Sequence, residues 1–279
     1  MKKACVIGWP IAHSRSPLIH SYWLKKYGID ATYEKKAVEP KSLAQFIANL
    51  AASEFIGCNV TIPHKEAAFQ AVAKVDEIAS RLGAVNTVYF GNGQVCGTNT
   101  DGEGFIASLH HSHPAFDLRS KTAIIIGAGG AAKAIVGALL DEGVKKIGII
   151  NRTRERILDL QVQFGSGIYE ISETNSNDAL KSCGLLVNTT SQGMEGQPSL
   201  ELEIQSLNPN TLVADIVYTP LETALLGKAK QLGHPVLGGL GMLLHQAVRG
   251  FELWFGIKPE VTSELYELIA ADVQKAHKQ

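Results

Sequence analysis

The stretch that decides the fold runs from Thr122 to Thr153, TAIIIGAGGAAKAIVGALLDEGVKKIGIINRT. An apolar run that ends at Ile126 predicts a buried strand, and the Ala-rich segment behind it predicts a helix. Between them, Gly127, Gly129 and Ala132 fit the G-x-G-x-x-G/A pattern of dinucleotide-binding turns. The first glycine permits a tight turn, the second lets backbone approach a pyrophosphate, and the third small residue lets the helix pack on the strand. The sequence therefore predicts a β-α-β unit that binds a dinucleotide.

The end of the next strand indicates which dinucleotide is bound. Chains that bind NAD usually carry Asp or Glu there, for the ribose 2′-hydroxyl. This chain has Asn151, Arg152 and Thr153 instead, with Arg154 and Arg156 behind them. Because arginine suits a 2′-phosphate, the segment predicts an NADP(H) site. A structural glycine turn beside solvated arginines is the alternative, and the strand-helix-strand context favours the cofactor site.

Length and composition set the broad class. With 279 residues the chain favours two domains, and its net charge of -1 implies no bulk attraction to nucleic acid or to anionic membranes. Four scattered cysteines without a C-x-x-C pair indicate reduced thiols. The N-terminus fails as a signal peptide because Gly8 and Pro10 break its apolar run, and no stretch is long enough to span a bilayer. We expect a cytoplasmic protein with a small-molecule substrate, and the sequence leaves open whether it is a homodimer.

The order of the elements predicts the architecture. Short apolar strands alternate with helical patterns, including helices over 41–52 and 65–82, which predicts an α/β fold with a mostly parallel sheet. Residues 104–110 are expected to link two modules. Two closing helices, at 242–255 and 263–275, are expected to pack back on the first module. The predicted domains are therefore 1–103 plus 243–279, and 104–242.

Three histidines raise the question of a metal. His110, His111 and His113 are expected in a loop, where adjacent histidines lack the geometry that one helical face provides. No acidic or cysteine partner is near them in the sequence. We therefore expect solvated histidines and no metal.

Small polar residues gather after the first predicted strand. Ser14 and Ser16 flank Arg15, and Ser16 before Pro17 is expected to be the N-cap of a helix that extends through Tyr27. Two hydroxyls beside helix N-terminal amides suit an anion such as a carboxylate. An N-cap serine with an ordinary neighbour is the alternative, and these residues alone favour it.

The segment from Gly57 to Lys65, GCNVTIPHK, is also polar where a strand is expected. Asn59 and Thr61 share one face of that strand, and Ile62 belongs to the opposite face. An Asn on a core strand is costly unless it is paired, so Asn59 is interpreted as a ligand-facing group. Lys65 follows at the turn, where a lone lysine is usually a solvated residue.

Two later segments add partners for this lysine. Asn86 stands at the start of a strand, and Asp101 lies in a glycine-bracketed loop after another strand. A carboxylate near Lys65 would position the ammonium and tune its charge state. Both residues also suit contacts with substrate hydroxyls.

With these segments in view, the chain resembles the shikimate dehydrogenase family nearly from end to end. One small departure is Thr189, where the family more often has Ala. The resemblance is carried by Gly8-Trp9-Pro10, His13-Ser14-Arg15-Ser16-Pro17, Asn59-Val60-Thr61-Ile62-Pro63-His64-Lys65, Gly83-Ala84-Val85-Asn86-Thr87, Asn99-Thr100-Asp101-Gly102, Gly127 to Ala132, Asn151-Arg152-Thr153, Asn188-Thr189-Thr190-Ser191-Gln192-Gly193-Met194, Asp215-Ile216-Val217-Tyr218-Thr219-Pro220 and Gly241-Met242-Leu243-Leu244-His245-Gln246-Ala247.

The resemblance implies reversible NADPH-dependent reduction of 3-dehydroshikimate to shikimate, in the pathway to aromatic amino acids. It implies that Lys65 and Asp101 form the catalytic pair, and it leaves open which of them transfers the proton. The residues implied to contact substrate are Ser14, Ser16, Asn59, Thr61, Asn86, Tyr218 and Gln246. Those implied to line the cofactor are Gly127, Gly129, Gly130, Ala131, Asn151, Arg152, Thr153, Arg156, Thr190, Met194, Val217, Gly239 and Met242.

The same resemblance assigns roles to the predicted domains. Residues 1–103 plus 243–279 are expected to bind substrate and carry catalysis, and 104–242 to form a Rossmann-like NADP-binding domain, with substrate between them. Two alternatives stay open. An NAD-using quinate/shikimate dehydrogenase is disfavoured by Arg152, and a non-catalytic NADP(H)-binding sensor is disfavoured by the intact pair of Lys65 and Asp101.

Overall fold

The computed structural model describes residues 2–172 and 176–277 and divides into two compact units. The first unit comprises Met1–Asp101 and Leu244–Ile269, and the second comprises Gly102–Leu243 and Ala270–Gln279. The predicted divisions at 103 and 243 lie within two residues of these bounds, whereas the end of the last helix is grouped with the second unit. The roles assigned to the two domains stay predictions.

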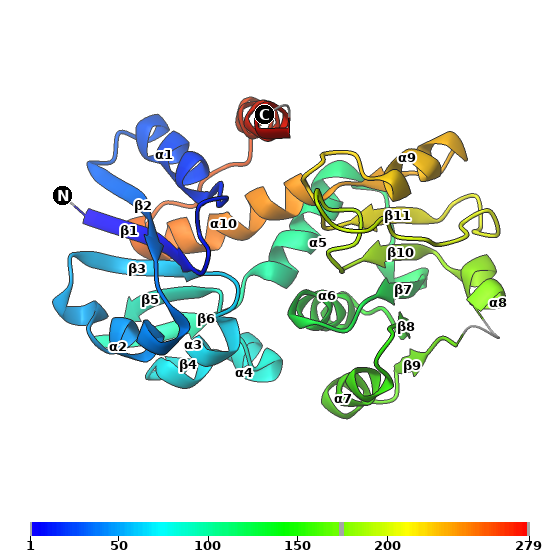
Figure 1. The fold of residues 1–279 in the computed structure, drawn as a ribbon, viewed down its shortest axis with the longest axis horizontal. Coiled ribbons are helices and arrows are strands. Elements are labelled where there is room, and N and C mark those ends of the chain that lie inside the picture. Colours follow the sequence, from blue (N-terminus) through cyan, green and yellow to red (C-terminus); the bar gives the residue numbers. More distant parts are fainter. Residues whose placement is uncertain (1, 173–175, 278–279) are drawn as a thin grey trace. The chain divides into compact units, whose positions relative to one another are not determined.

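The first unit is built on a six-stranded sheet with the order β2-β1-β3-β5-β6-β4 (Figure 1). β1 runs parallel to β2 and β3, and β4 runs parallel to β6, whereas β5 is antiparallel to β3 and β6. The sheet is therefore mostly parallel, as the sequence predicts. Its strands are β1 (Lys2–Gly8), β2 (Ala31–Ala37), β3 (Phe55–Val60), β4 (Lys74–Val75), β5 (Thr87–Gly91) and β6 (Gln94–Thr98).

Helices cover both faces of this sheet because its strands alternate apolar side chains between them. Cys5 and Ile7 of β1 point into a core that includes Leu43, Ile47 and Ala68 from the helices on one side. The other side is covered by α1 and by the part of α10 that belongs to this unit. The helices are α1 (Ser16–Lys26), α2 (Leu43–Ala48), α3 (Lys65–Ala71), α4 (Glu77–Leu82), α10 (Gly239–Phe255) and α11 (Ser263–His277).

Side chains of α1, β2 and α10 form an aromatic cluster centred on His20. The His20 ring stacks on Tyr33 with centroids 4.1 Å apart, and Trp254 lies 5.5 Å from the same ring. The Trp254 ring N–H donates to the Val88 carbonyl at 2.9 Å. Gly57 makes room for this contact, since a Cβ there would lie 2.2 Å from the Trp254 nitrogen. Aromatic packing thus holds the later half of α10 against the sheet.

The second unit contains a parallel sheet with the order β12-β11-β10-β7-β8-β9. Counted within the unit, this is the 3-2-1-4-5-6 order of a doubly wound Rossmann sheet. Alternate residues of β7 serve its two faces, with Ile125 in one core and Ile124 and Ile126 in the other. The strands are β7 (Thr122–Ile126), β8 (Lys146–Ile150), β9 (Ile168–Glu170), β10 (Leu185–Asn188), β11 (Leu212–Asp215) and β12 (Val236–Leu237).

Helices on both sides complete the Rossmann-like arrangement. Ala132 and Ile135 of α6 are fully buried against the sheet. The helices are α5 (Asp101–Ser112), α6 (Gly130–Asp141), α7 (Arg154–Phe164), α8 (Ser176–Ser182) and α9 (Ala224–Gln231). The predicted fold class is thus confirmed. No helix along the described residues has the length and apolar content that crossing a bilayer requires.

The expectation that His110 and His111 lie in a loop is wrong. Residues 104–112 belong to helix α5, which buries Phe105 and Leu109 at helical spacing in the core of the second unit. Glycines at its start obscured that period in the sequence. His113 follows the helix, and its Nε2 lies 3.0 Å from the Val236 carbonyl oxygen.

Further local predictions need correction. Arg15 is the N-cap of α1, so Ser16 is the first helical residue and makes no side-chain cap. The helix expected over 65–82 is interrupted by β4, because this segment pairs with β6. The helix expected over 41–52 is α-helical only between two 3₁₀ turns. Ile62 is 74 % exposed rather than in the core, since β3 ends before it.

The buried His20 predicts a pH dependence of stability. Burial lowers its pKa from an ordinary value of 6.5 to about 3. The unfolded chain therefore binds a proton below pH 6.5 that the folded protein does not, and stability falls as pH decreases from about 6.5 toward 3. The slope from this group reaches about 1.4 kcal/mol per pH unit. In urea unfolding between pH 7 and 4.5, His20→Phe should show a shallower loss than wild type, and equal slopes would contradict the assignment.

Candidate active site

The polar motifs of the first unit meet at one edge of its sheet. β1, β3 and β6 all end there, because β3 runs parallel to β1 and antiparallel pairing on both sides of β5 returns β6 to the same direction. For the same reason β5 begins at this edge. Segments that are far apart in the chain therefore converge, as the carboxyl ends of strands do in open α/β sheets.

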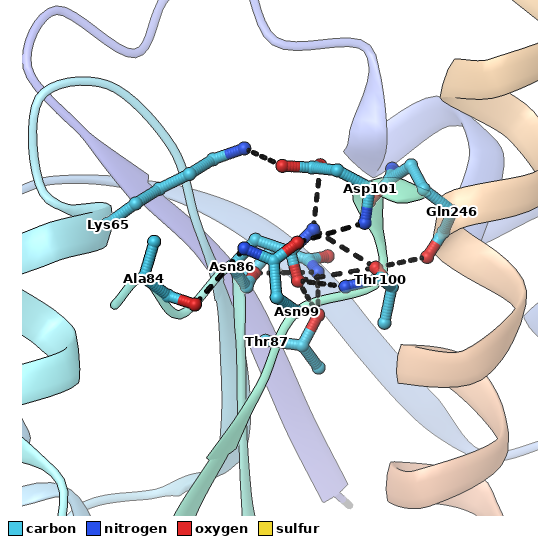
Figure 2. Close-up of polar contacts among 9 residues, drawn as sticks. Lys65, Ala84, Asn86, Thr87, Asn99, Thr100, Asp101 and Gln246 are labelled. Atoms are coloured by element: carbon cyan, nitrogen blue, oxygen red, sulfur yellow. Dashed lines mark hydrogen bonds and ion pairs between the residues drawn. The ribbon is translucent and has the colours of Figure 1, made fainter. Parts of the chain in front are cut away.

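Lys65 and Asp101 form an ion pair at this edge. The Lys65 Nζ donates to Asp101 Oδ2 at 2.5 Å, and the side chains are 29 % and 11 % exposed (Figure 2). Lys65 is the first residue of α3, and its carbonyl accepts from the Val85 N–H at 2.9 Å. The preceding His64 is buried, and its ring nitrogen lies 2.7 Å from the Val38 carbonyl oxygen. The lysine thus extends from an anchored turn rather than into bulk solvent.

The other carboxylate oxygen is held by a buried amide. The Asn86 Nδ2 donates to Asp101 Oδ1 at 2.8 Å and to Thr100 Oγ1 at 3.0 Å (Figure 2). The Thr100 hydroxyl donates in turn to the Gln246 carbonyl of α10 at 2.8 Å. Asn99 fixes the backbone, because its Oδ1 accepts from the Asp101 N–H at 3.1 Å. The carboxylate is therefore oriented before any substrate arrives.

The predicted substrate residues in this unit differ in whether their polar groups are already bonded within the protein. Asn59 is buried and bonded to protein groups, with its Oδ1 accepting from the Tyr33 hydroxyl at 2.6 Å. Thr61 is half-buried just past β3, and none of the described residues is shown bonding its hydroxyl. Ser14 donates to the Ser16 Oγ at 3.3 Å and accepts from the Ser16 N–H at the same distance. The Asn59 amide is therefore bonded within the protein, and its contact with substrate stays a prediction.

Four groups of this network escaped the sequence reasoning: Tyr33, Thr87, Asn99 and Thr100. Thr87 and Thr100 sit beside Asn86 and Asp101 in the motifs, so their positions were a usable signal. Tyr33 carried none, because only the pairing of β2 with β1 and of β1 with β3 places it near Asn59.

The second unit presents its own polar edge, where β7 turns into α6. Gly127 has a φ of 104°, and a Cβ there would lie 2.8 Å from Thr189 Oγ1. A Cβ at Gly129 or Gly130 would meet nothing within 4 Å, so the backbone before α6 is open to a ligand. This is the cradle that a pyrophosphate needs at a helix N-terminus, and it begins where the strand order reverses between β7 and β10.

The segment after β8 offers an anion site. Arg152 is exposed, and the structure gives it no ion pair among the described residues, whereas Arg154 pairs with Glu170 at 2.9 Å. Thr153 is the N-cap of α7 but makes no side-chain cap, so its hydroxyl is not used there. The Asn151 amide donates to the Thr153 carbonyl at 2.7 Å and shapes the turn. A cation and a hydroxyl thus stand together, as a 2′-phosphate requires.

One buried carboxylate ties together the loops that follow β10 and β11. Asp215 accepts from Asn188 Nδ2 at 3.0 Å, from Thr223 Oγ1 at 2.7 Å and from the Val217 N–H at 3.0 Å. Burial raises its pKa, and these three bonds act in the opposite direction. Asn188 also accepts from the Thr190 hydroxyl at 2.8 Å. The loops that carry Val217 and Thr190 are therefore set by one anchor.

The remaining predicted residues lie on the same unit, apart from Gln246. Tyr218 is half-buried after Val217, and Met194 is 40 % exposed. Gly239 begins α10, where a Cβ would lie 2.1 Å from the Ile216 carbonyl oxygen. Met242 packs partly buried on the core. Arg156 and Ala131 lie in the first turns of α7 and α6.

Within residues 2–172 and 176–277, no cluster of three or more His, Cys, Asp or Glu side chains is arranged to hold a metal. The ion pair of the first unit and the glycine cradle of the second unit define an oxidoreductase of the NADP-binding class.

Comparison with known proteins identifies the family. Residues 6–88 match the shikimate dehydrogenase substrate binding domain, residues 109–201 match the shikimate/quinate 5-dehydrogenase family, and residues 239–263 match the shikimate 5′-dehydrogenase C-terminal domain. A shikimate dehydrogenase (NADP(+)) of Nitrobacter hamburgensis is 50 % identical over 99 % of this chain and 96 % of its own length. The chain belongs to the shikimate dehydrogenase family.

Solved structures agree with this placement. Shikimate 5-dehydrogenase from Thermus thermophilus, in complex with NADP(H) and shikimate, has a TM-score of 0.87 at 33 % identity, covering 98 % of this chain and 100 % of that one. Quinate dehydrogenase from Corynebacterium glutamicum, in complex with NAD, has a TM-score of 0.88 at 30 % identity, covering 97 % and 99 %. The fold is thus shared by relatives solved with different cofactors, so the fold alone does not distinguish NADP from NAD.

Arg152→Ala is predicted to weaken NADPH selectively. Losing a charge-assisted hydrogen bond to the 2′-phosphate costs about 1.5–3 kcal/mol, which is roughly ten- to a hundredfold in affinity. The KM for NADPH should rise accordingly, while the KM for NADH changes little. Arg154→Ala is the matched control, since that side chain pairs with Glu170. Equal losses for NADPH and NADH would remove Arg152 from the 2′-phosphate site.

Proposed function

We propose that this protein catalyses the reversible NADPH-dependent reduction of 3-dehydroshikimate to shikimate, with Lys65 and Asp101 as its catalytic pair. The protein is an NADP-dependent oxidoreductase that acts on a CH–OH group, and its place is in aromatic amino-acid biosynthesis. The observation that carries the site assignment is the 2.5 Å contact between Lys65 Nζ and Asp101 Oδ2 at the polar edge of the first sheet.

Reduction of a ketone is favoured by a cation beside the carbonyl oxygen. Reduction of a ketone develops negative charge on oxygen, and a positioned ammonium stabilises that charge more in the transition state than in the ground state. Lys65 fills this role and Asp101 holds its Nζ in place. One of the two gives the proton that completes the alcohol, and in the reverse direction it takes the hydroxyl proton. NADPH, when bound, supplies the hydride.

The remaining roles are proposed from the motif positions that this chain shares with the shikimate dehydrogenase family. Ser14 and Ser16 bind the substrate carboxylate, and Thr61, Asn86, Tyr218 and Gln246 contact ring hydroxyls. On the second unit, the open backbone at Gly129 and Gly130 receives the pyrophosphate. Arg152 and Thr153 receive the 2′-phosphate, and the 1–103 plus 243–279 and 104–242 domains divide substrate and cofactor between them.

Compartment and assembly are also proposals. All four cysteines are buried free thiols, which suits a reducing compartment such as the cytoplasm. We propose a homodimer as the assembly to test first, by light scattering on the purified chain.

The activity is tested by following NADPH absorbance. Shikimate with NADP should turn over fastest among the four combinations of shikimate or quinate with NADP or NAD. A preference for quinate and NAD would move the protein to the alternative dehydrogenase. No turnover in any combination would support the sensor.

Lys65→Ala is predicted to lower kcat by about a hundred- to ten-thousandfold, the usual range for a general acid–base group, with shikimate affinity changing far less. Asp101→Asn should lower kcat as well, and the double variant should lose less than the product of both effects, because the pair acts as a unit. Glu103→Gln is the control for Asp101→Asn, since Glu103 is exposed on α5. A near-normal kcat in Lys65→Ala would reduce Lys65 to a binding residue.

Ser14→Ala is predicted to raise the KM for shikimate, since a carboxylate would lose one hydroxyl donor worth about 1.5–3 kcal/mol. The dissociation constant for NADPH, measured by fluorescence, should stay at its wild-type value. An unchanged KM and kcat for shikimate would exclude Ser14 from the site.

A further inference from the structure

A continuous chain of buried hydrogen bonds leads from the aromatic cluster to Asp101. The Tyr33 hydroxyl donates to Asn59 Oδ1 at 2.6 Å, and Asn59 Nδ2 donates to Thr87 Oγ1 at 3.1 Å. Thr87 Oγ1 donates to Asn86 Oδ1 at 2.9 Å, and Asn86 Nδ2 donates to Asp101 Oδ1 at 2.8 Å. The chain crosses the sheet from β2 through β3 to the start of β5, and its last members are drawn in Figure 2.

Backbone groups fix the direction of every donor in this chain. The Asn86 carbonyl can only accept, and it lies 3.4 Å from Asn59 Nδ2, so the Asn59 amide nitrogen faces Thr87. The Thr100 N–H can only donate, and it reaches Asn86 Oδ1 at 3.0 Å, so the Asn86 oxygen faces away from Asp101. The single proton of Thr87 is therefore free to point at Asn86. All donors run toward the carboxylate.

The start of the chain is equally determined. Burial raises the pKa of Tyr33 well above its ordinary value of 10, so the phenol stays protonated and acts as a donor. Stacking on the buried His20 ring holds the phenol in position.

We propose that Thr87 is a positioning residue for the reaction, through which Tyr33 and Asn59 orient the Asn86 amide and hence the Asp101 carboxylate against Lys65. This inference rests on the proposed function. It gives Asn59 a role behind the site in place of direct substrate contact. Aligned donors in a buried network strengthen one another, and a half-satisfied network costs more than a complete one.

Thr87→Val tests the proposal, because it removes the hydroxyl and keeps the shape of a fully buried side chain. We expect kcat for shikimate oxidation to fall about five- to tenfold, the factor that corresponds to one neutral hydrogen bond. The dissociation constant for shikimate should stay within about twofold. Thr87→Ser keeps the hydroxyl and should restore most of kcat. Thr211→Val is the matched control, since its buried hydroxyl bonds the Cys183 carbonyl in the second unit.

A second variant separates positioning from general loosening of the core. Tyr33→Phe alone should lower kcat two- to threefold, by our estimate for the far end of a polarised chain. When Tyr33→Phe is combined with Thr87→Val, kcat should fall no further than in Thr87→Val alone, because the chain of hydrogen bonds is already broken at residue 87. Multiplicative losses in the double variant would show two independent structural effects and overturn the proposal.

The outcomes also separate this inference from the proposed function. Turnover that is abolished by Lys65→Ala but unchanged by Thr87→Val would overturn the inference alone. The inference would also be overturned if Thr87→Ser lost as much kcat as Thr87→Val. A loss of kcat in the control Thr211→Val equal to that in Thr87→Val would overturn it as well. A wild-type enzyme without turnover of shikimate and NADP would overturn the proposed function, and the inference with it.

Discussion

The two hydrogen bonds that the Asn86 amide donates, to Thr100 and to Asp101, hold the residue before β5 against the turn that follows β6. Its oxygen accepts from Thr87 and from the Thr100 backbone, so every polar atom of this buried side chain is used. A buried amide with a missing partner is costly. The turns that start β5 and end β6 can therefore take only the arrangement that satisfies it, and that arrangement places a carboxylate 2.5 Å from Lys65.

In the second unit, glycines and one buried carboxylate fix the loops at the edge of the sheet. Parallel strands deliver all their carboxyl ends to one edge, and the backbone there must stay open where a pyrophosphate is to lie. Gly127 and Gly129 keep it open, and Asp215 draws the neighbouring loops inward. Arg152 lies outside this buried network, which leaves its charge available to a ligand.

Much of this could be predicted from the sequence, because the signals were local. The strand, glycine turn and helix around Gly127 depend on neighbouring residues, and the structure has them as predicted. The errors arose where contacts are distant. β4 forms only because β6 lies beside it, and residues 104–112 are helical because Phe105 and Leu109 find a core to bury against. Ser16 lost its expected capping role by a shift of one residue at the helix start.

The sequence by itself determined the α/β class, the dinucleotide turn and the basic strand end, since each is written in residue types at short spacing. Lys65 and Asp101 are 36 residues apart, and the sequence named them as a pair only through the family resemblance. Only the tertiary structure decided that the Asn59 amide bonds Tyr33 and Thr87. The physical reason is that a strand's alternation tells which residues share a face but not what lies against that face. The order of β2, β1, β3 and β5 supplies that information, and it is set by packing across the whole sheet.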